Sequence, residues 1–261
     1  MDLGLAGKRA VVTGASKGIG LAVAQALARE GCAIDIAARD QVALAAAGES
    51  VTAAAPGSQI RVHSLDLGGV DDQERLVQAC CDAEILVNNA GAVPAGSLDE
   101  TSDSQWRDGW NLKVFGYINL SRAFYKIMQR RRSGVIINII GSAGDRLNAK
   151  YIMGSTGNAA LMAFTRSAGS QSPDFGVRIV GVNPGYTATE RAENQLRAFS
   201  SKRFGTADRW REIESDMNLP FGRMARPEEI ADVVAFLASP KASYISGTIV
   251  TVDGGALHRN F

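Results

Sequence analysis

The sequence predicts an α/β domain in which seven parallel strands form one sheet with helices on both faces. Short β-branched apolar runs alternate with longer amphipathic stretches along the chain, a pattern typical of parallel strands joined by crossover helices. Of the 261 residues, 46% are hydrophobic and 21% charged, which excludes collagen-like, disordered and coiled-coil chains. No repeat or low-complexity linker interrupts the alternation, so residues 1–261 are assigned to a single domain.

Each element follows from its local pattern. Strands are expected where short β-branched and apolar runs occur, at 9–13, 33–37, 60–64, 85–88, 135–140, 177–182 and 248–252. Helices are expected over the longer amphipathic stretches, at 18–30, 42–54, 70–81, 104–131, 155–170 and 227–238. The last helix begins with proline and two glutamates, which favour a first helical turn.

One segment, residues 187–222, departs from this alternation. It is polar and charged and has no strand period. Long irregular segments in compact domains are usually functional lids or disorder, so we expect a mobile lid over a substrate site. Its cationic side chains between Arg191 and Glu212 fit either an anionic substrate or a solvated amphipathic helix.

The charge balance and the residue counts exclude several classes of protein. Lys and Arg number 28 against 27 Asp and Glu, which leaves no basic field for nucleic acid or an anionic membrane. Cys32, Cys80, Cys81, His63 and His258 have no usual metal-ligand spacing, so no metal site is expected. With few cysteines, no signal peptide and apolar runs far shorter than about 18 residues, the expected location is the cytoplasm.

A glycine-rich turn follows the first strand and leads directly into a helix. Its glycines permit a tight turn and close approach of backbone N–H groups to a diphosphate, which the helix N-terminus also attracts. A turn of this kind can also merely connect two elements. The candidate phosphate-binding residues are Gly14, Ser16, Lys17, Gly18, Ile19 and Gly20.

Further motifs follow in a fixed order. They are TGxxxGxG from Thr13, Asp66-Leu67, Asn88-Asn89-Ala90-Gly91, Asn183-Pro184-Gly185 with Thr189, and Val252-Asp253-Gly254-Gly255. With them the chain resembles the short-chain dehydrogenase/reductase family over about 250 residues. The resemblance implies a doubly wound, Rossmann-like sheet with a dinucleotide at the switch point, and a homodimer or homotetramer. It also implies cofactor contacts by Asp66, Leu67, Asn89, Ala90, Gly91, Pro184, Gly185, Thr187 and Thr189.

Residues at the end of the second strand decide between the two nicotinamide cofactors. An acid there bonds a free ribose 2′-hydroxyl, whereas a cation accepts a 2′-phosphate. Ala38 stands where relatives that prefer NAD carry the acid, and Arg39 and Lys17 are cationic. We therefore expect NADP(H), the alternative being that Asp35 or Asp40 sets a different preference.

The catalytic residues are located by resemblance to the family, which uses a tyrosine, a lysine four residues later, a serine and an asparagine. Asn111 matches the asparagine and Ser142 the serine that orients the substrate. The Tyr-Lys element is missing: counting back from the sequence after it puts Gly154 at the tyrosine position and Asn158 at the lysine position.

Tyr151 is the tyrosine nearest to the missing pair. Tyr151, Ser155 and Asn158 share one helical face if the helix begins early enough, but helical side chains lean toward the N-terminus, away from the usual site. A structural role for Tyr151 therefore stays open beside a catalytic one. Asn158 lacks a charge but can bond the nicotinamide ribose.

Two functional hypotheses follow. The first is an NADP(H)-dependent oxidoreductase acting on the carbonyl or secondary alcohol of a small molecule that the sequence does not identify, with altered proton-donating machinery. The second is a cofactor-binding sensor or partner subunit with little turnover.

Overall fold

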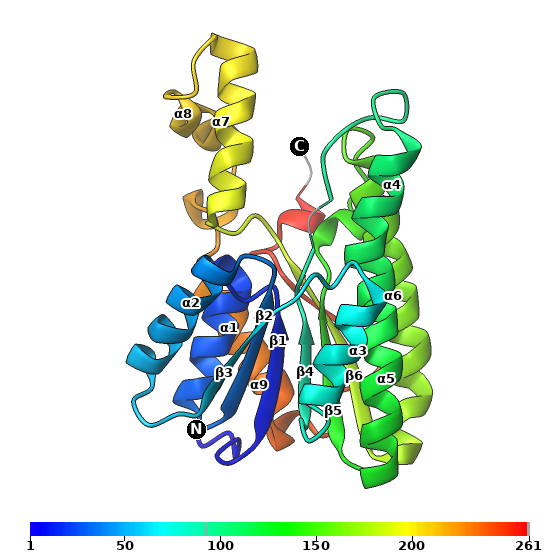
Figure 1. Cartoon of the computed structure of the whole chain (residues 1–261). Helices are drawn as coiled ribbons and strands as arrows, with labels where there is room; N and C mark the ends of the chain where they lie inside the picture. Colours follow the sequence, from blue (N-terminus) through cyan, green and yellow to red (C-terminus); the bar gives the residue numbers. More distant parts are fainter. Residues whose placement is uncertain (92, 260–261) are drawn as a thin grey trace.

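The computed structural model describes residues 1–91 and 93–259. Within them, one parallel sheet contains all seven predicted strands in the order β3-β2-β1-β4-β5-β6-β7 (Figure 1). The order reverses between β1 and β4, and ligands of such sheets bind outside the carboxyl ends of the strands at this switch point. The strands are β1 Arg9–Thr13, β2 Ala33–Ala38, β3 Ile60–Ser64, β4 Ile85–Asn88, β5 Gly134–Ile139, β6 Val177–Pro184 and β7 Ile249–Val252.

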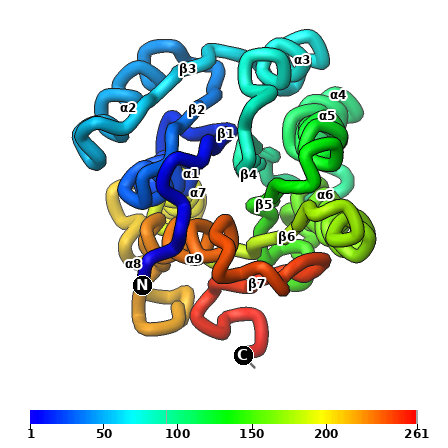
Figure 2. The backbone as a smooth tube through the Cα atoms, turned by 90° about the horizontal axis from the view of Figure 1, so that it is seen from below, coloured from blue at the N-terminus to red at the C-terminus, as the bar shows by residue number. Residues whose placement is uncertain are grey.

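Helices cover both faces of the sheet (Figure 2). The first layer contains α1 Gly18–Arg29, α2 Gln41–Ala54 and α9 Pro227–Ala238. The second contains α3 Val70–Ala79, α4 Asp103–Trp110, α5 Gly116–Arg131 and α6 Ile152–Gln171. Because neighbouring strand residues point to opposite faces, β1 contributes Ala10 and Val12 to the apolar core under the first layer and Val11 to the core under the second.

The segment 187–222 was expected to be irregular. It instead forms a pair of helices. Helix α7 spans Glu190–Phe204 and α8 spans Trp210–Asp216, and both project beyond the carboxyl edge of the sheet (Figure 1). A small cluster of Ala192, Leu196 and Met224, with Trp210 packed against it, joins the pair. The segment is thus helical, and most of its cationic residues, including Lys202, Arg203, Arg209 and Arg211, are exposed.

Candidate active site

The glycine turn between β1 and α1 has the predicted shape. Gly14 and Gly18 have φ of +64° and +59°, a conformation that glycine adopts without strain. A Cβ on Gly14 would lie 2.7 Å from the Cα of Ala90, so the turn and the segment after β4 are in backbone contact. The N–H groups of Gly14 and Ala15 donate to the Ala37 carbonyl at 2.7 and 3.4 Å, and the turn leads into the N-terminus of α1, which is the kind of site that attracts anions.

Asn89 and Thr13 hold these two segments together. The Asn89 side chain donates to the carbonyls of Thr13 and Gly14, both at 3.0 Å. The Thr13 hydroxyl accepts from the N–H groups of Asn89 and Ala90, at 2.9 and 3.0 Å. The residues Asn89 and Ala90 that were predicted from the motif thus shape the cleft at the switch point.

The adenosine side of the cleft is bordered by Arg39, which is exposed at the end of β2. The two alternative acids make contacts of their own. Asp35 is fully buried in the first half of β2 and bonded to arginines, and Asp40 caps α2 by accepting from the N–H groups of Val42 and Ala43. Asp66, after β3, is also exposed, and its carboxylate accepts from Gly68 N–H, whereas Leu67 is buried.

The opposite side of the cleft is formed by the segment after β6. Pro184 ends that strand, and Gly185 N–H donates to the carbonyl of Val252 at 3.0 Å. The Thr187 side chain is buried and donates to Gly185, while Thr189 caps α7. A Cβ on Gly18 would lie 3.2 Å from Thr189, so this segment reaches across to the glycine turn.

The first turn of α7 is tied to both sides of the cleft. Glu190 pairs with Lys17 of the glycine turn at 2.8 Å. Arg191 donates to the carbonyls of Gly91 and Val93 at 3.1 and 2.9 Å. Lys17 and Gly91 were expected at the cofactor. The contacts of Arg191 were not predicted, because its partners lie about 100 residues earlier in the chain.

Asn111 lies where the predicted helix 104–131 changes its geometry. Residues Asn111–Phe115 form a π-helical turn between α4 and α5, and Gly116 N–H donates to the Asn111 carbonyl five residues earlier. Such bulges occur mainly at functional sites. Asn111 is exposed at this turn.

Asn158 and Ser142 lie at the turn that follows β5. The buried Asn158 amide donates to the carbonyl of Gly141 at 3.3 Å, and Gly141 N–H donates to the Asn183 side chain at 3.2 Å. A Cβ on Gly141 would lie 3.0 Å from the Asn158 amide nitrogen. Ser142 is the next residue, and its hydroxyl has no hydrogen-bond partner within the described residues.

Tyr151 is folded over Gly154, the residue aligned with the family's tyrosine. A Cβ built on Gly154 would overlap the Tyr151 ring, with the phenolic oxygen 2.5 Å away. Tyr151 precedes α6 as its N-cap, with φ −138° and ψ 41°, so the lean of helical side chains does not apply to it. The ring lies along the helix beside position 154, and both a structural and a catalytic role of Tyr151 stay open.

Lys113 was missed as a candidate from sequence. It lies two residues after Asn111, and its ammonium group donates to the carbonyls of Ile139 and Ile140 at 3.1 and 2.9 Å. Burial, with the nearby Arg191 charge, lowers the pKa of Lys113 to about 7. Its position in an N-x-K triplet on the helix that carries Asn111 was the available signal.

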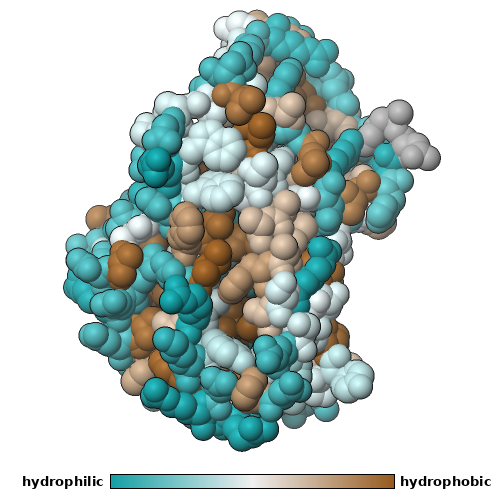
Figure 3. Space-filling model, turned by 90° about the vertical axis from the view of Figure 1, so that its right-hand side faces the viewer, coloured by the Kyte–Doolittle hydropathy of each residue, from teal (hydrophilic) through white to brown (hydrophobic). Residues whose placement is uncertain are grey.

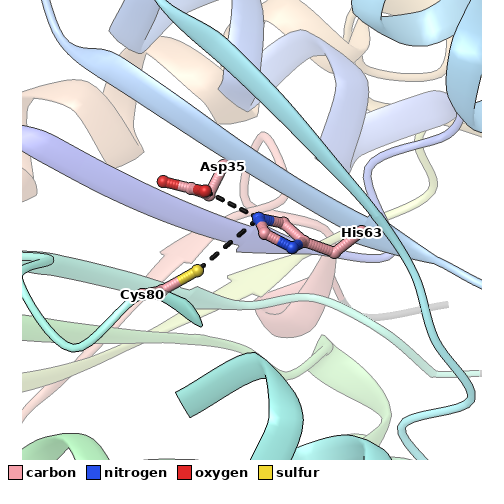
Figure 4. Close-up of side chains that lie close together, drawn as sticks. All are labelled: Asp35, His63 and Cys80. Atoms are coloured by element: carbon pink, nitrogen blue, oxygen red, sulfur yellow. Dashed lines mark hydrogen bonds and ion pairs between the residues drawn. The ribbon is translucent and has the colours of Figure 1, made fainter. Parts of the chain in front are cut away.

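Three titratable side chains lie close together away from the cleft (Figure 4). They are Asp35 of β2, His63 of β3 and Cys80 at the end of α3. His63 is 2.7 Å from Asp35 and 3.6 Å from the Cys80 sulfur, a contact that the sequence spacing did not predict. Burial alone would raise the pKa of Asp35, but hydrogen bonds from His63 and Arg61 lower it to about 2. Since Arg9 and Arg61 also pair with this carboxylate, the cluster is a structural ion network.

Comparison with known proteins assigns the family. Residues 14–257 match the family described as Enoyl-(Acyl carrier protein) reductase. Galactitol 2-dehydrogenase (L-tagatose-forming) of Cereibacter sphaeroides is 34% identical, covering 96% of this chain and 95% of the relative. The 3-oxoacyl-[acyl-carrier-protein] reductase of Vibrio harveyi is 32% identical, with 97% and 98% covered.

Solved structures agree with this assignment. L-sorbose reductase of Gluconobacter frateurii, in complex with NADPH and L-sorbose, has a TM-score of 0.92 and 30% identity, and 100% of each chain is covered. A single-substitution variant of actinorhodin polyketide ketoreductase with NADPH has a TM-score of 0.90 and 27% identity, with 97% and 98% covered. The chain belongs to the short-chain dehydrogenase/reductase family and is an oxidoreductase of carbonyl or alcohol substrates. No helix in its described part has the length and apolarity that a membrane span needs.

Proposed function

We propose that the protein is an NADP(H)-dependent oxidoreductase in which Tyr151 takes the place of the tyrosine missing at position 154. The observation that carries the proposal is the Tyr151 ring, which fills the space beside Gly154. Gly154 has no side chain, so it leaves room for this ring, and the phenol reaches the site from the helix N-cap instead of from the first turn.

Three features favour NADP(H). Ala38 offers no carboxylate to the ribose, Arg39 is exposed next to it, and Asp35 and Asp40 are engaged in the ion network and the α2 cap. Lys17 forms an exposed ion pair with Glu190. Exposed ion pairs are weak, so Lys17 can exchange this partner for a 2′-phosphate. L-sorbose reductase and the polyketide ketoreductase, both similar in structure, bind NADPH.

Bound NADPH supplies the hydride for the carbonyl carbon. The side chains of this protein hold the carbonyl and provide the proton. The Ser142 hydroxyl is free to donate to the carbonyl oxygen, Tyr151 protonates it, and Asn111 connects the phenol to solvent. Asn158 holds the Gly141 carbonyl and keeps the Ser142 turn in place. A positioned general acid contributes about 10²- to 10⁴-fold.

The substrate is proposed to be a small carbonyl compound, with polyol-derived ketoses and 3-oxoacyl thioesters as the first to test. These follow from the substrates named for galactitol 2-dehydrogenase, L-sorbose reductase and 3-oxoacyl reductase. A cofactor-binding protein with little turnover is the second candidate, favoured by Asn158 at the lysine position.

Assembly into a homodimer or homotetramer is part of the proposal. Figure 3 shows that apolar and weakly polar side chains run down the middle of the face formed by α5 and α6, between hydrophilic borders. Phe115, next to α5, is 49% exposed. Faces of this kind are typical of protein contacts, and sedimentation velocity of the full chain tests the assembly.

The function is tested by NADPH oxidation over these carbonyl compounds. Tyr151→Phe should lower turnover about 100-fold and leave NADPH affinity unchanged. Tyr125→Phe is the matched control, because Tyr125 lies on α5 against Phe175, at a ring distance of 6.4 Å. If wild type binds NADPH but reduces none of them, the low-turnover candidate is favoured; equal rates for Tyr151→Phe and wild type exclude Tyr151 as donor.

A further inference from the structure

Lys113 reaches the site from the helix opposite α6. Its ammonium group binds the carbonyls of Ile139 and Ile140 at the carboxyl end of β5. Its stem runs beneath Gly91, where a Cβ would lie 2.5 Å from the Lys113 Cδ. The absence of a side chain at Gly91 is therefore what lets the lysine pass to the end of β5.

The ammonium group binds the same turn as Asn158, the residue at the position that lacks its lysine. Asn158, at that position, binds the Gly141 carbonyl, and Lys113 binds the Ile140 carbonyl one residue earlier. Two consecutive carbonyls of the turn before Ser142 are thus held by side chains from two different helices. The Lys113 ammonium group thus brings to this turn the positive charge that Asn158 lacks.

The surroundings of the ammonium group leave its charge uncompensated. Tyr117, from the same helix, donates to the Ile139 carbonyl, and its ring centre is 5.1 Å from the Lys113 nitrogen. Arg191 of α7 is a second cation, and burial together with its charge lowers the pKa of Lys113. Burial and Tyr151, at the start of α6, raise the pKa of Tyr117. The ends of β4 and β5 contribute backbone groups, and no carboxylate in the described part of the chain pairs with Lys113.

The hydrogen bonds leave one donor for a ligand. An ammonium group has three N–H donors, and the two carbonyls accept two of them. A lysine needed only for packing would gain more by reaching solvent with its charge. The charge is instead held where burial lowers the pKa of Lys113 to about 7, which is the kind of perturbation found at functional sites.

We propose that Lys113 performs the task of the lysine missing at position 158, as a positioning residue that binds the nicotinamide ribose and keeps a positive charge beside Tyr151. The inference rests on the proposed function. In reduction, the hydride passes from NADPH to the carbonyl carbon and the proton from the Tyr151 phenol to the carbonyl oxygen. Lys113 stays protonated and stabilises the phenolate that remains until solvent reprotonates it.

The first test is binding, which needs no substrate. Lys113→Met should weaken NADPH at least tenfold, measured by cofactor fluorescence, and leave adenosine 2′,5′-bisphosphate unchanged, because that compound lacks the nicotinamide ribose. Lys126→Met, at an exposed position of the neighbouring α5, is the matched control. If wild type does not bind NADPH, the proposed function fails. If wild type binds NADPH and Lys113→Met binds it equally well, the role of Lys113 is refuted.

The second test separates a functional charge from a packing role. Wild-type reduction should decline on the alkaline side as Lys113 loses its proton, and this limb should disappear in Lys113→Met and move to higher pH in Lys113→Arg. Asn158→Lys should restore at least tenfold of the turnover lost in Lys113→Met. An unchanged alkaline limb in folded Lys113→Met, or no rescue by Asn158→Lys, contradicts the proposal.

Discussion

The two sides of the cleft differ in what forms them. On the side of β1 and β4, backbone groups form the surface, with glycines in contact with Ala90 and with Asn89 bonded to carbonyls. On the side of β5 and α6, a few side chains carry the proposed chemistry, and two of them, Tyr151 and Lys113, are proposed to act from positions other than 154 and 158. A surface made of backbone tolerates no new side chain, whereas a task carried by side chains can be taken over from another position.

The largest effect is expected where the surface is backbone. Gly14→Val should lower NADPH affinity more than 100-fold, because a Cβ there meets the Ala90 backbone at 2.7 Å and φ is +64°. Gly57→Ala is the control, since Gly57 also has positive φ but no heavy atom within 4 Å of a Cβ. Titration of cofactor fluorescence measures both, and retained affinity in Gly14→Val would contradict the backbone description.

The second effect concerns the side-chain half. Gly154→Tyr with Asn158→Lys should fail to rebuild the family's pair, because the new tyrosine overlaps the Tyr151 ring. Adding Tyr151→Ala removes the overlap and should raise turnover at least tenfold above the double variant. Turnover and circular dichroism of both variants are the measurements. A fully active double variant would support the alignment of Gly154 and Asn158 and would show that the Tyr151 ring moves aside for the new tyrosine.

The third effect concerns the free energy of unfolding, to which the charge of Asp35 contributes. The pKa of Asp35 is lowered from 3.8 to about 2 by His63 and Arg61, against its burial. Its ionised form thus contributes about 2 kcal/mol above pH 4, and this is lost as the pH falls to 2. Urea unfolding of wild type and Asp35→Asn across this range should show a larger loss of stability in wild type than in the variant. Parallel curves would place the acid sensitivity elsewhere.

The fourth effect is cofactor preference. Arg39→Ala should reduce the preference for NADPH over NADH about tenfold, since one charged hydrogen bond contributes about 1.5–3 kcal/mol. Arg29→Ala, at the exposed end of α1, is the control. The ratio of the two dissociation constants is the readout, and an unchanged ratio would assign the 2′-phosphate to other residues.

The smallest effect concerns the lid, whose movement is a prediction. NADPH should slow amide exchange in α7 a few-fold, because cofactor and lid meet at Lys17 and the segment after β6. Exchange already fully slowed without cofactor would identify α7 and α8 as a fixed insert. The α9 amides provide the internal reference.

The sequence predicted the strands to within two residues because alternation of apolar runs is local. The 187–222 segment was misjudged, since the burial of Leu196 and the packing of Trp210 depend on contacts between helices. Lys113 was missed for a similar reason: its function depends on the bare Gly91 and on carbonyls 26 and 27 residues away. Local rules also left the position of the Tyr151 ring open, because its backbone as the N-cap of α6 is not helical.

The contact between Tyr151 and Gly154 has a consequence for the history of this chain. Restoring a tyrosine at 154 while Tyr151 remains creates an overlap, and removing Tyr151 first leaves the site without either phenol. On the proposed role of Tyr151, no single substitution at either position therefore gives the family's arrangement. Residues 151 and 154 are expected to change together.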